Sequence, residues 1–338
     1  MNIAIDCRYI GKSGIGRVCE GILGALDYST HEFYLIGKRS LLDKYSKAHI
    51  IEDNTDPYSV AGLRSFDKRL NKLCKALIIP NFLIPFGVKI PVYSIMHDLA
   101  FLDVKETTRG FTDKLIKKIL LKRCMKKSAS IACVSAFTLS RCKHYYGKLA
   151  KKCYVNYNGI SESVFTFASL LSPAQKQNCI VFVGNVKPHK GLHVLLSAFS
   201  KLKDGTQLKI IGEKENFLTG LSFDEKEYEN VVFTGKLNDK ALFTEIASAR
   251  YLVLPSKYEG FGLPPLEALV LGTQPIVSDI PVFREVYEGL PVKFFKTEEE
   301  LTALMKQTPE IIDCAWAVKE KFQYKDCAEG ILRYIVHS

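Results

Sequence analysis

The stretch RYLVLPSKYEGFGLPPLEALVLG, residues 250–272, decides the fold class of this chain. Its first part, residues 250–256, is a continuous apolar run of the kind that forms a buried parallel strand. Residues 264–271 are apolar again, begin with two prolines and are followed by Gly272, which predicts a short helix. A strand that leads through a glycine-bearing turn into a helix is typical of parallel α/β sheets.

The turn of this unit has the features of a binding site. It follows the carboxyl end of the predicted strand, the edge at which open α/β sheets bind ligands. Gly260 and Gly262 let the backbone approach a ligand and present N–H groups at a helix N-terminus, which favours an anion. Glu259 and Glu267 stand on either side, and we expect Glu267 on the first helical turn, where it can accept from vicinal hydroxyls of a sugar or ribose. Each Glu taken alone is also compatible with an ordinary solvated or dipole-stabilised residue.

Strand and helix patterns alternate along the rest of the chain in two series. The 338 residues favour two domains, and the alternation predicts an α/β fold in which each domain has a doubly wound parallel sheet. We place the boundary in the stretch 167–178, which contains Pro173. The predicted strands of the first series are 2–7, 32–36, 76–79, 92–96, 130–134 and 154–157, and those of the second begin at Cys179 and continue at 208–211, 231–233, 251–254, 275–277 and 292–295.

Three further segments put polar or glycine residues at predicted strand ends. Lys187 and Lys190, with Gly184 beside them, lie between a strand and the predicted helix 192–202, where a diphosphate could be held. His97 follows the strand 92–96. The turn GKSGIG, residues 11–16, separates a strand from a helix that we expect to begin at Arg17.

Together these segments resemble family 4 of the retaining glycosyltransferases over nearly the whole chain. The two glutamates, with seven residues between them, resemble its paired-glutamate signature, and residues 180–199 resemble its donor-phosphate loop. SIMHDLAF (94–101) resembles its His-Asp segment, residues 1–17 its first strand and glycine turn, and NGI (158–160) the end of its amino-terminal domain.

This resemblance implies the GT-B architecture, with two Rossmann-like domains that face each other across a cleft. Residues 1–168 would form the acceptor-side domain, and residues 178–314 would bind the nucleotide-sugar donor. A C-terminal helix over about 315–338 would pack back on the first domain.

The resemblance also implies roles on the donor side. Lys190, and as a weaker match Lys187, would hold the donor phosphates beside Gly184. Glu267 would accept from the donor ribose, and Glu259 would lie close to the transferred sugar. Backbone N–H groups would come from Phe261, Gly262 and Leu263. Because the lysines would neutralise the leaving diphosphate, and no DxD-type carboxylate pair stands at a strand end, we expect no metal and no other cofactor.

On the acceptor side, the resemblance implies that His97 hydrogen-bonds the transferred sugar. The alternative is a satisfied histidine at a strand end. We interpret Asp98 as a capping acceptor and not as a base. Gly14 and Gly16 would bring N–H groups near the β-phosphate or the acceptor. Glu259, His97 and Lys190 are therefore the candidate catalytic residues, and we see no covalent nucleophile.

Charge is concentrated in the first half of the chain. Of the formal net charge of +11, residues 1–165 contribute 27 Lys or Arg and 14 Asp or Glu, a net of +13. The densest run, residues 114–127, predicts a helix with two faces. The apolar face contains Leu115, Ile116, Ile119 and Leu120, and the basic face contains Lys114, Lys117, Lys118 and Lys122. Such a helix suits an anionic bilayer. A buried-face helix with a solvated basic side is the main alternative, and nucleic acid is disfavoured.

The ten cysteines form no CxxC pair and no Cys/His cluster at metal-ligand spacing, so we predict scattered, reduced core thiols. The first residues enter a strand pattern without a signal-peptide pattern, and prolines interrupt the apolar stretch 76–96. We therefore expect a cytoplasmic protein, peripheral at the inner face of the cell membrane.

These features lead to one functional prediction. The chain would be a retaining, metal-independent hexosyltransferase that uses a nucleotide diphosphate sugar, with GDP-mannose favoured and a UDP-hexose or dTDP-rhamnose as alternatives. The acceptor would be a hydroxyl of a lipid-linked glycan in bacterial O-antigen or capsule synthesis. A catalytically inactive scaffold that binds a sugar nucleotide is the remaining alternative. A Rossmann oxidoreductase is disfavoured because Glu32 opens the second strand and does not close it.

Overall fold

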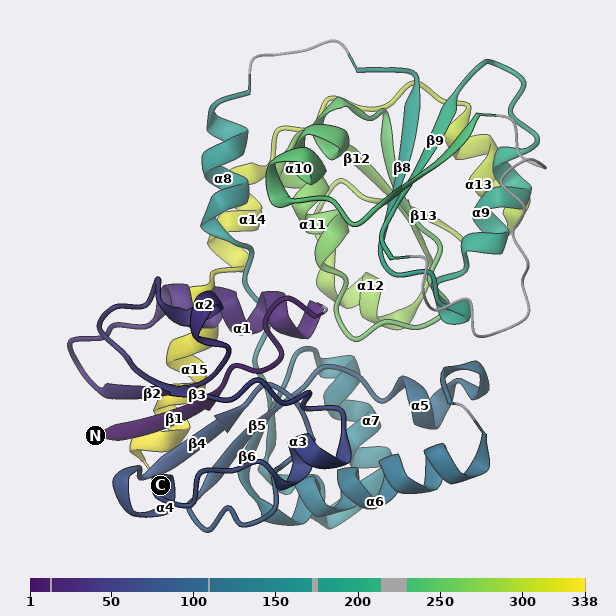
Figure 1. Ribbon diagram of the computed structural model, residues 1–338. Coiled ribbons are helices and arrows are strands. Elements are labelled where there is room, and N and C mark those ends of the chain that lie inside the picture. Colours follow the sequence, from purple (N-terminus) through teal and green to yellow (C-terminus); the bar gives the residue numbers. More distant parts are fainter. Residues whose placement is uncertain (13, 109, 172–175, 214–229, 338) are drawn as a thin grey trace. The chain divides into compact units, whose positions relative to one another are not determined.

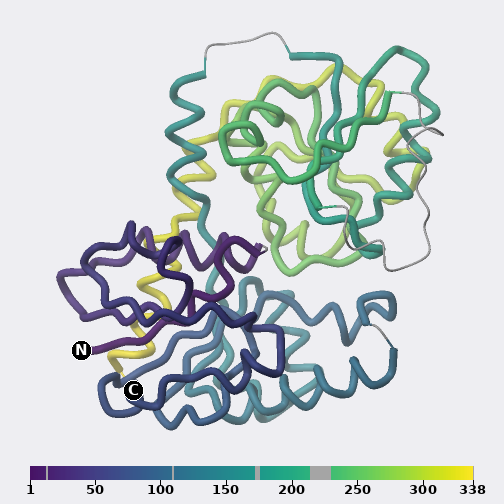
Figure 2. Tube along the Cα trace, viewed as in Figure 1, coloured from purple at the N-terminus to yellow at the C-terminus, as the bar shows by residue number. Residues whose placement is uncertain are grey.

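The chain divides into two compact units, which we describe one at a time (Figures 1 and 2). The computed structural model describes residues 1–12, 14–108, 110–171, 176–213 and 230–337. The first unit comprises Met1–Leu102, Thr108–Gly159 and Phe322–Ser338, and the second comprises Asp103–Thr107 and Ile160–Lys321. Each unit contains one sheet, and every strand pair in both sheets is parallel.

The first unit is built on a seven-stranded sheet of order β3-β2-β1-β4-β5-β6-β7. The chain proceeds from β1 outward to β3 and then returns to the other side of β1, so the direction of winding reverses between β1 and β4. The strands are β1 (Asn2–Asp6), β2 (Glu32–Gly37), β3 (His49–Glu52), β4 (Ala76–Ile79), β5 (Val92–Met96), β6 (Ser128–Cys133) and β7 (Cys153–Val155).

Helices cover this first sheet, and the C-terminal helix packs on the first one. Figure 1 shows the yellow helix α15 beside the purple helix α1. The helices of the unit are α1 (Gly14–Ala25), α2 (Arg39–Leu42), α3 (Val60–Arg64), α4 (Leu70–Leu73), α5 (Ala100–Asp103), α6 (Phe111–Lys127), α7 (Ala136–Tyr146), η2 (Gly147–Lys152) and α15 (Tyr324–Val336).

The second unit has a six-stranded sheet of order β10-β9-β8-β11-β12-β13, in which winding reverses between β8 and β11. Its strands are β8 (Cys179–Val183), β9 (Gln207–Ile211), β10 (Val231–Gly235), β11 (Tyr251–Leu254), β12 (Gln274–Ser278) and β13 (Lys293–Phe295). Its helices are η1 (Lys105–Thr107), α8 (Glu162–Ser169), η3 (Pro188–Lys190), α9 (Leu192–Phe199), α10 (Asp239–Ser248), α11 (Leu263–Val270), α12 (Pro281–Val286), α13 (Glu298–Met305) and α14 (Ala315–Lys321).

The predicted α/β class with two parallel sheets is confirmed, and most predicted strands match to within two residues. The short edge strand β3 has no buried residue, so it left no apolar run in the sequence. The helix expected to begin at Arg17 begins at Gly14.

The C-terminal part of the chain also differs in detail from the prediction. In place of one helix over about 315–338 there are two, α14 in the second unit and α15 in the first. The helix α8 packs on α10 and α11 of the second unit, and Glu162 pairs with Lys319 of α14 at 2.9 Å, so the second unit begins before residue 168. Part of the expected boundary segment, residues 172–175 with Pro173, lies outside the described residues.

No helix within the described part of the chain has both the length and the hydropathy needed to span a bilayer.

Candidate functional site

The second unit brings two loops together where the winding of its sheet reverses. One loop follows β8 and leads through η3 into α9, and the other follows β11 and leads into α11. Strands β8 and β11 are hydrogen-bonded neighbours, so both loops leave the same carboxyl edge of the sheet side by side. Such a switch point is where open α/β sheets bind their ligands, because the two loops diverge and leave a crevice.

An ion pair joins these loops. The Nζ of Lys190 lies 2.5 Å from Oε1 of Glu259, and the same oxygen accepts a hydrogen bond of 2.8 Å from Oγ of Ser256. The side chains of Lys190 and Glu259 are 21% and 12% exposed, so the pair is partly shielded from water and still accessible. The backbone supports it, since Lys257 N donates to His189 O at 2.8 Å. The structure therefore places a cation and a carboxylate together at the switch point.

The β11–α11 turn is held by close packing at Gly262. This residue has φ +94°, and a Cβ there would lie 2.3 Å from Oη of Tyr287 and 2.8 Å from Cε1 of Phe283. The Tyr287 hydroxyl donates to the Gly262 carbonyl at 2.7 Å. Burial, and secondarily the charge of Glu259, raises the pKa of Tyr287 well above its usual value, which keeps this hydroxyl a donor. Only glycine allows this contact.

The prediction that Glu267 lies on the first turn of the helix is wrong. The helix α11 begins at Leu263, so residues 263–266 form its first turn and Glu267 follows on the second. Glu267 is 3% exposed and Phe261 on the loop is 4% exposed, so both are buried, and Leu263 is half-buried. Leu263 is the first residue of α11 and Gly262 is its N-cap, whereas Pro264 and Pro265 have no N–H. The role of the backbone N–H groups of residues 261–263 toward a ligand stays a prediction.

The other predicted donor-side residues lie on the β8 loop. Gly184 follows β8 with φ +152°, and its N–H donates to Ile211 O at 2.9 Å. The side chain of Lys187 is exposed, and its carbonyl accepts from Lys190 N at 2.9 Å in the turn that leads to η3. The two lysines therefore belong to one turn, and Lys190 makes an ion pair with Glu259.

In the first unit, His97 lies just beyond β5 and is tied to the loop after β4. Its Nε2 donates to the Pro80 carbonyl at 3.0 Å, since a carbonyl can only accept. Burial lowers the pKa of His97, against the opposing effects of Asp98 and Pro80, so the ring is neutral near pH 7. With the proton on Nε2, the Nδ1 atom is a hydrogen-bond acceptor. Asp98 accepts from Ala100 N at 2.9 Å, the capping role predicted for it.

The two glycines of the first loop differ in their surroundings. Gly14 opens α1, and a Cβ added there would meet no atom of the described residues within 4 Å, so its side is open. A Cβ on Gly16 would lie 2.3 Å from the Tyr9 carbonyl, so Gly16 serves close packing of α1 against the chain that leaves β1. Ser13 of this turn lies outside the described residues.

Sequence reasoning missed a cavity of about 680 Å³ at the carboxyl ends of β1 to β3. Buried Arg8 lines it and pairs with Asp6 at 2.6 Å and with Asp53 at 3.2 Å. Because Asp53 is distant in sequence, only pairing of β3 brings it here. The lining residues are Cys7, Arg8, Ile10, Lys12, Lys38, Arg39, Ser40, Leu41, Asp43, Glu52, Asp53, Asn54 and Thr55.

The basic helix α6 does not bury the apolar face that the sequence predicts. Its buried residues are Leu121, Cys124 and Met125, whereas Ile116 and Ile119 of the predicted apolar face are 57% and 59% exposed. The helix is fixed to the loop after β4 by Arg123, which donates to the Ile84 and Pro85 carbonyls. Apolar and basic side chains thus share one exposed surface, which includes Phe111, Leu115, Ile116, Lys118, Ile119 and Lys122.

Ser256, Pro80 and Tyr287 were also not anticipated. Ser256 lies three residues before Glu259 at a strand end, a spacing that could have suggested a hydrogen bond. The Pro80 carbonyl bonds His97 and the Tyr287 hydroxyl bonds the Gly262 carbonyl. Both contacts join residues that are distant in sequence, so no local pattern predicts them.

Comparison with known proteins agrees with this geometry. Residues 169–315 match the family described as Glycosyl transferases group 1. The O-antigen chain mannosyltransferase RfbU of Salmonella typhimurium is 30% identical over 217 residues, which cover 60% of this chain and 60% of that protein. The serotype-specific mannosyltransferase WbdA of Escherichia coli is 28% identical over 182 residues, 49% of this chain and 22% of that protein. The chain thus spans about 60% of the Salmonella relative's length.

Solved structures match the whole chain at low identity and therefore show its fold. Anabaena HepE, solved with UDP and glucose, has a TM-score of 0.73 at 14% identity and full coverage of both chains. The lipopolysaccharide outer core galactosyltransferase WaaB has a TM-score of 0.66 at 16% identity, and the match covers 100% of this chain and 99% of that one. The predicted GT-B fold class is confirmed, while membership of family 4 in particular stays a prediction. Residues 169–315, which include both loops of the switch point, are similar to the glycosyl transferases group 1 family.

Proposed function

We propose that this chain is a glycosyltransferase that moves a hexose from a nucleotide diphosphate sugar to a hydroxyl of a growing glycan. The observation that carries the proposal is the ion pair of Lys190 and Glu259 at the switch point of the second sheet, within the matched domain. An ammonium group has three N–H donors, and Glu259 takes one. The others can bind phosphate oxygens while Glu259 stays close to the sugar.

The reaction that we propose is retaining and needs no metal. The bond from C1 of the sugar to the phosphate oxygen breaks, the acceptor oxygen bonds to C1 on the same face, and its proton passes to the leaving phosphate. Negative charge grows on that phosphate in the transition state, where Lys190, Lys187 and the N–H groups that begin α11 would stabilise it. Glu267 would accept from the ribose hydroxyls, and Gly184 would let the phosphates approach β8.

The first unit would supply the remaining contacts. Nδ1 of neutral His97 would accept a hydrogen bond from a hydroxyl of the transferred sugar, because its Nε2 is committed to Pro80. The open side of Gly14 would let a phosphate or the acceptor approach the start of α1, while Gly16 keeps that start in place. These roles are positioning roles, which orient the reacting groups.

GDP-mannose is the donor that we favour, since two relatives are named mannosyltransferases and one of them is named for the O-antigen chain. A UDP-hexose is the main alternative, because HepE of the same fold was solved with UDP and glucose. A dTDP-rhamnose donor remains a further alternative, as does an inactive scaffold that binds the nucleotide sugar.

We also propose that the acceptor is lipid-linked and that the α6 surface lies on the inner face of the cell membrane. Exposed isoleucines can enter the headgroup region while each nearby lysine adds about 1 kcal/mol on an anionic surface. Lys118 and Lys122 are exposed, whereas Lys117 pairs with Asp113 at 2.7 Å. Binding to phosphatidylglycerol vesicles should therefore fall more for Lys118→Gln than for Lys117→Gln. Unchanged binding in both variants would assign the helix to plain solvation, and equal losses would show that the pair with Asp113 does not shield Lys117.

The donor is tested with a thermal-shift and hydrolysis screen of GDP-mannose, UDP-glucose, UDP-galactose, UDP-N-acetylglucosamine and dTDP-rhamnose in the presence of EDTA. One clear stabiliser would identify the donor and support metal independence, and the anomeric configuration of the product by NMR would test retention. Stabilisation without hydrolysis or transfer would favour the inactive scaffold, and absence of any response would favour a donor site that forms only with the acceptor.

The role of Lys190 is tested against a matched ion pair of the same unit. Lys209 pairs with Glu245 at 2.6 Å and is 17% exposed, which is similar to Lys190, but it lies on β9 away from the loops. Loss of a charged hydrogen bond of about 1.5–3 kcal/mol in the transition state predicts that Lys190→Ala slows turnover roughly 10 to 150 fold. Lys209→Ala should leave turnover unchanged. Wild-type turnover in Lys190→Ala would remove the assignment.

A further inference from the structure

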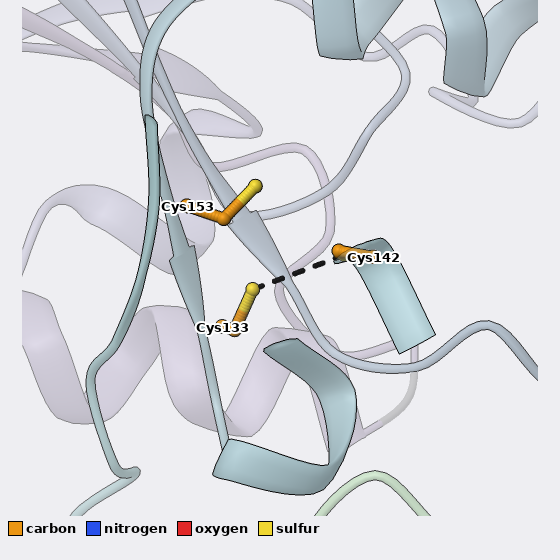
Figure 3. A group of neighbouring side chains, drawn as sticks. All are labelled: Cys133, Cys142 and Cys153. Carbon is orange, nitrogen blue, oxygen red and sulfur yellow. Dashed lines mark hydrogen bonds between the residues drawn. The ribbon is translucent and has the colours of Figure 1, made fainter. Parts of the chain in front are cut away.

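Three of the ten cysteines gather in the core of the first unit, contrary to the prediction of scattered thiols. All ten are free and buried. The Sγ atoms of Cys133, Cys142 and Cys153 lie within 4.8 Å of one another, and those of Cys133 and Cys142 are 3.9 Å apart (Figure 3). Their separations along the chain match no metal motif, so the cluster arises only from tertiary packing.

The cluster comes from three rigid elements. Cys133 ends β6 and Cys153 begins β7, and the register pairs Cys153 with Ile131, two residues before Cys133 on the same face of the sheet. Cys142 lies on α7, which packs against both strands. Figure 3 shows the two strand cysteines on neighbouring strands and Cys142 approaching from the helix. Ligands on strands and helices are held more firmly than ligands on loops.

The spacing of the sulfur atoms suits a bound metal ion. With metal–sulfur bonds of about 2.3 Å, three thiolates in a plane around one ion lie about 4.0 Å apart. The Sγ atoms of Cys133 and Cys142 are 3.9 Å apart, which is already close to this value. All three Sγ atoms lie within 4.8 Å of one another, so small side-chain movements would bring them to the spacing that the ion needs. A disulfide would need sulfur atoms about 2.05 Å apart, which is a larger movement.

We propose that Cys133, Cys142 and Cys153 form a three-thiolate site for a soft, thiophilic metal ion, with Cu(I) as the ion that fits best. Thiolate ligands select Cu(I) and Zn(II) among the biological metals, but zinc in structural sites takes four ligands. The described residues contribute only these three to the cluster, and Cu(I) accepts three sulfur ligands. Cys153 is 9% exposed while the other two are fully buried, so the ion would enter past Cys153.

Metal binding would stabilise one edge of the first sheet. Strand β7 is the last strand in the order, and it has a partner on one side only. An ion held by β6, β7 and α7 would join this edge strand to its neighbour and to the helix between them. Because the folded unit holds three thiolates at the spacing that one ion needs, it would bind the ion more tightly than the unfolded chain does, and binding would raise the thermal stability of the protein.

The test is an anaerobic titration of the full chain with Cu(I), in competition with a chromophoric Cu(I) chelator. We expect one equivalent to be retained, with an ultraviolet thiolate-to-copper absorption band and a raised melting temperature. Cys142→Ala should weaken retention more than about 100-fold, since even loss of an outer-shell partner costs about 10–100-fold. Cys74→Ala, which removes a thiol from the same hydrophobic core, should retain copper like the wild type.

Two results would overturn the proposal. Equal loss of copper in Cys142→Ala and Cys74→Ala would show that burial of thiols in general, and not the cluster, governs binding. A disulfide between Cys133 and Cys142 in protein purified without reductant, detected by mass spectrometry, would assign the pair to thiol oxidation instead. If Cys142→Ala fails to fold, Cys153→Ala, at the exposed side of the cluster, gives the same comparison.

Discussion

Replacing Gly262 by alanine tests whether close packing, and not only backbone conformation, holds the β11–α11 turn. The residue has φ +94°, and left-handed backbone costs a non-glycine residue about 1–2 kcal/mol. The new Cβ would also lie 2.3 Å from Oη of Tyr287, and such overpacking costs about 1–3 kcal/mol. The sum, about 2–5 kcal/mol, corresponds to a fall of about 4–20 °C in the melting temperature of a unit of this size.

Two variants separate these contributions. Gly289 has φ +75°, and a Cβ there would meet no described atom within 4 Å, so Gly289→Ala should lose only the conformational part, about 1–2 kcal/mol. In a Tyr287→Phe background the nearest clashing atom is gone, so Gly262→Ala should cost less than in the wild type. Melting is followed by circular dichroism, with urea unfolding as a second measure.

The reasoning is refuted if Gly262→Ala and Gly289→Ala are equally destabilising, or if Tyr287→Phe brings no relief. In either case the 2.3 Å approach would be absorbed by movement of the turn at no cost. Thermal stabilisation by the donor, measured on the same variants, would then show whether the moved turn still binds.

Three further predictions concern pH and the α6 surface. Burial lowers the pKa of His97, so below about pH 6.5 the unfolded chain binds more protons than the folded chain, and the free energy of unfolding falls as the pH is lowered. In His97→Gln this fall should be less steep. Urea titrations that show the same steepness in both proteins would contradict this. Burial lowers the pKa of Lys176 from 10.5 to about 8, so between these pH values the unfolded chain holds a proton that the folded chain has lost. The contribution of Lys176 to the free energy of unfolding therefore rises from about pH 8 to 10.5, and Lys176→Met should lack that rise. Ile116→Ser with Ile119→Ser should weaken binding to anionic vesicles without lowering the melting temperature, because both side chains are exposed; a lowered melting temperature would show that they pack on the protein.

Much of the fold follows from local patterns in the sequence. Buried parallel strands are continuous apolar runs, so 76–79, 92–96 and 251–254 were predicted with the bounds that the structure has. The residues of the switch-point loops were predicted as well, since each follows a strand and precedes a helix. Local patterns do not predict a strand such as β3, because it buries no residue and so has no apolar run.

The sequence by itself determined the two parallel sheets, the loops at their carboxyl edges and the residue types that these loops carry, because strand and helix periodicity and turn chemistry are local. Only the tertiary structure decided which side chains meet. Lys190 and Glu259 are 69 residues apart and join because β8 and β11 are neighbours, and the same pairing of distant elements seats His97 on Pro80. It also gathers three cysteines and leaves the isoleucines of α6 in water, since contacts between elements depend on packing that no short window of sequence contains.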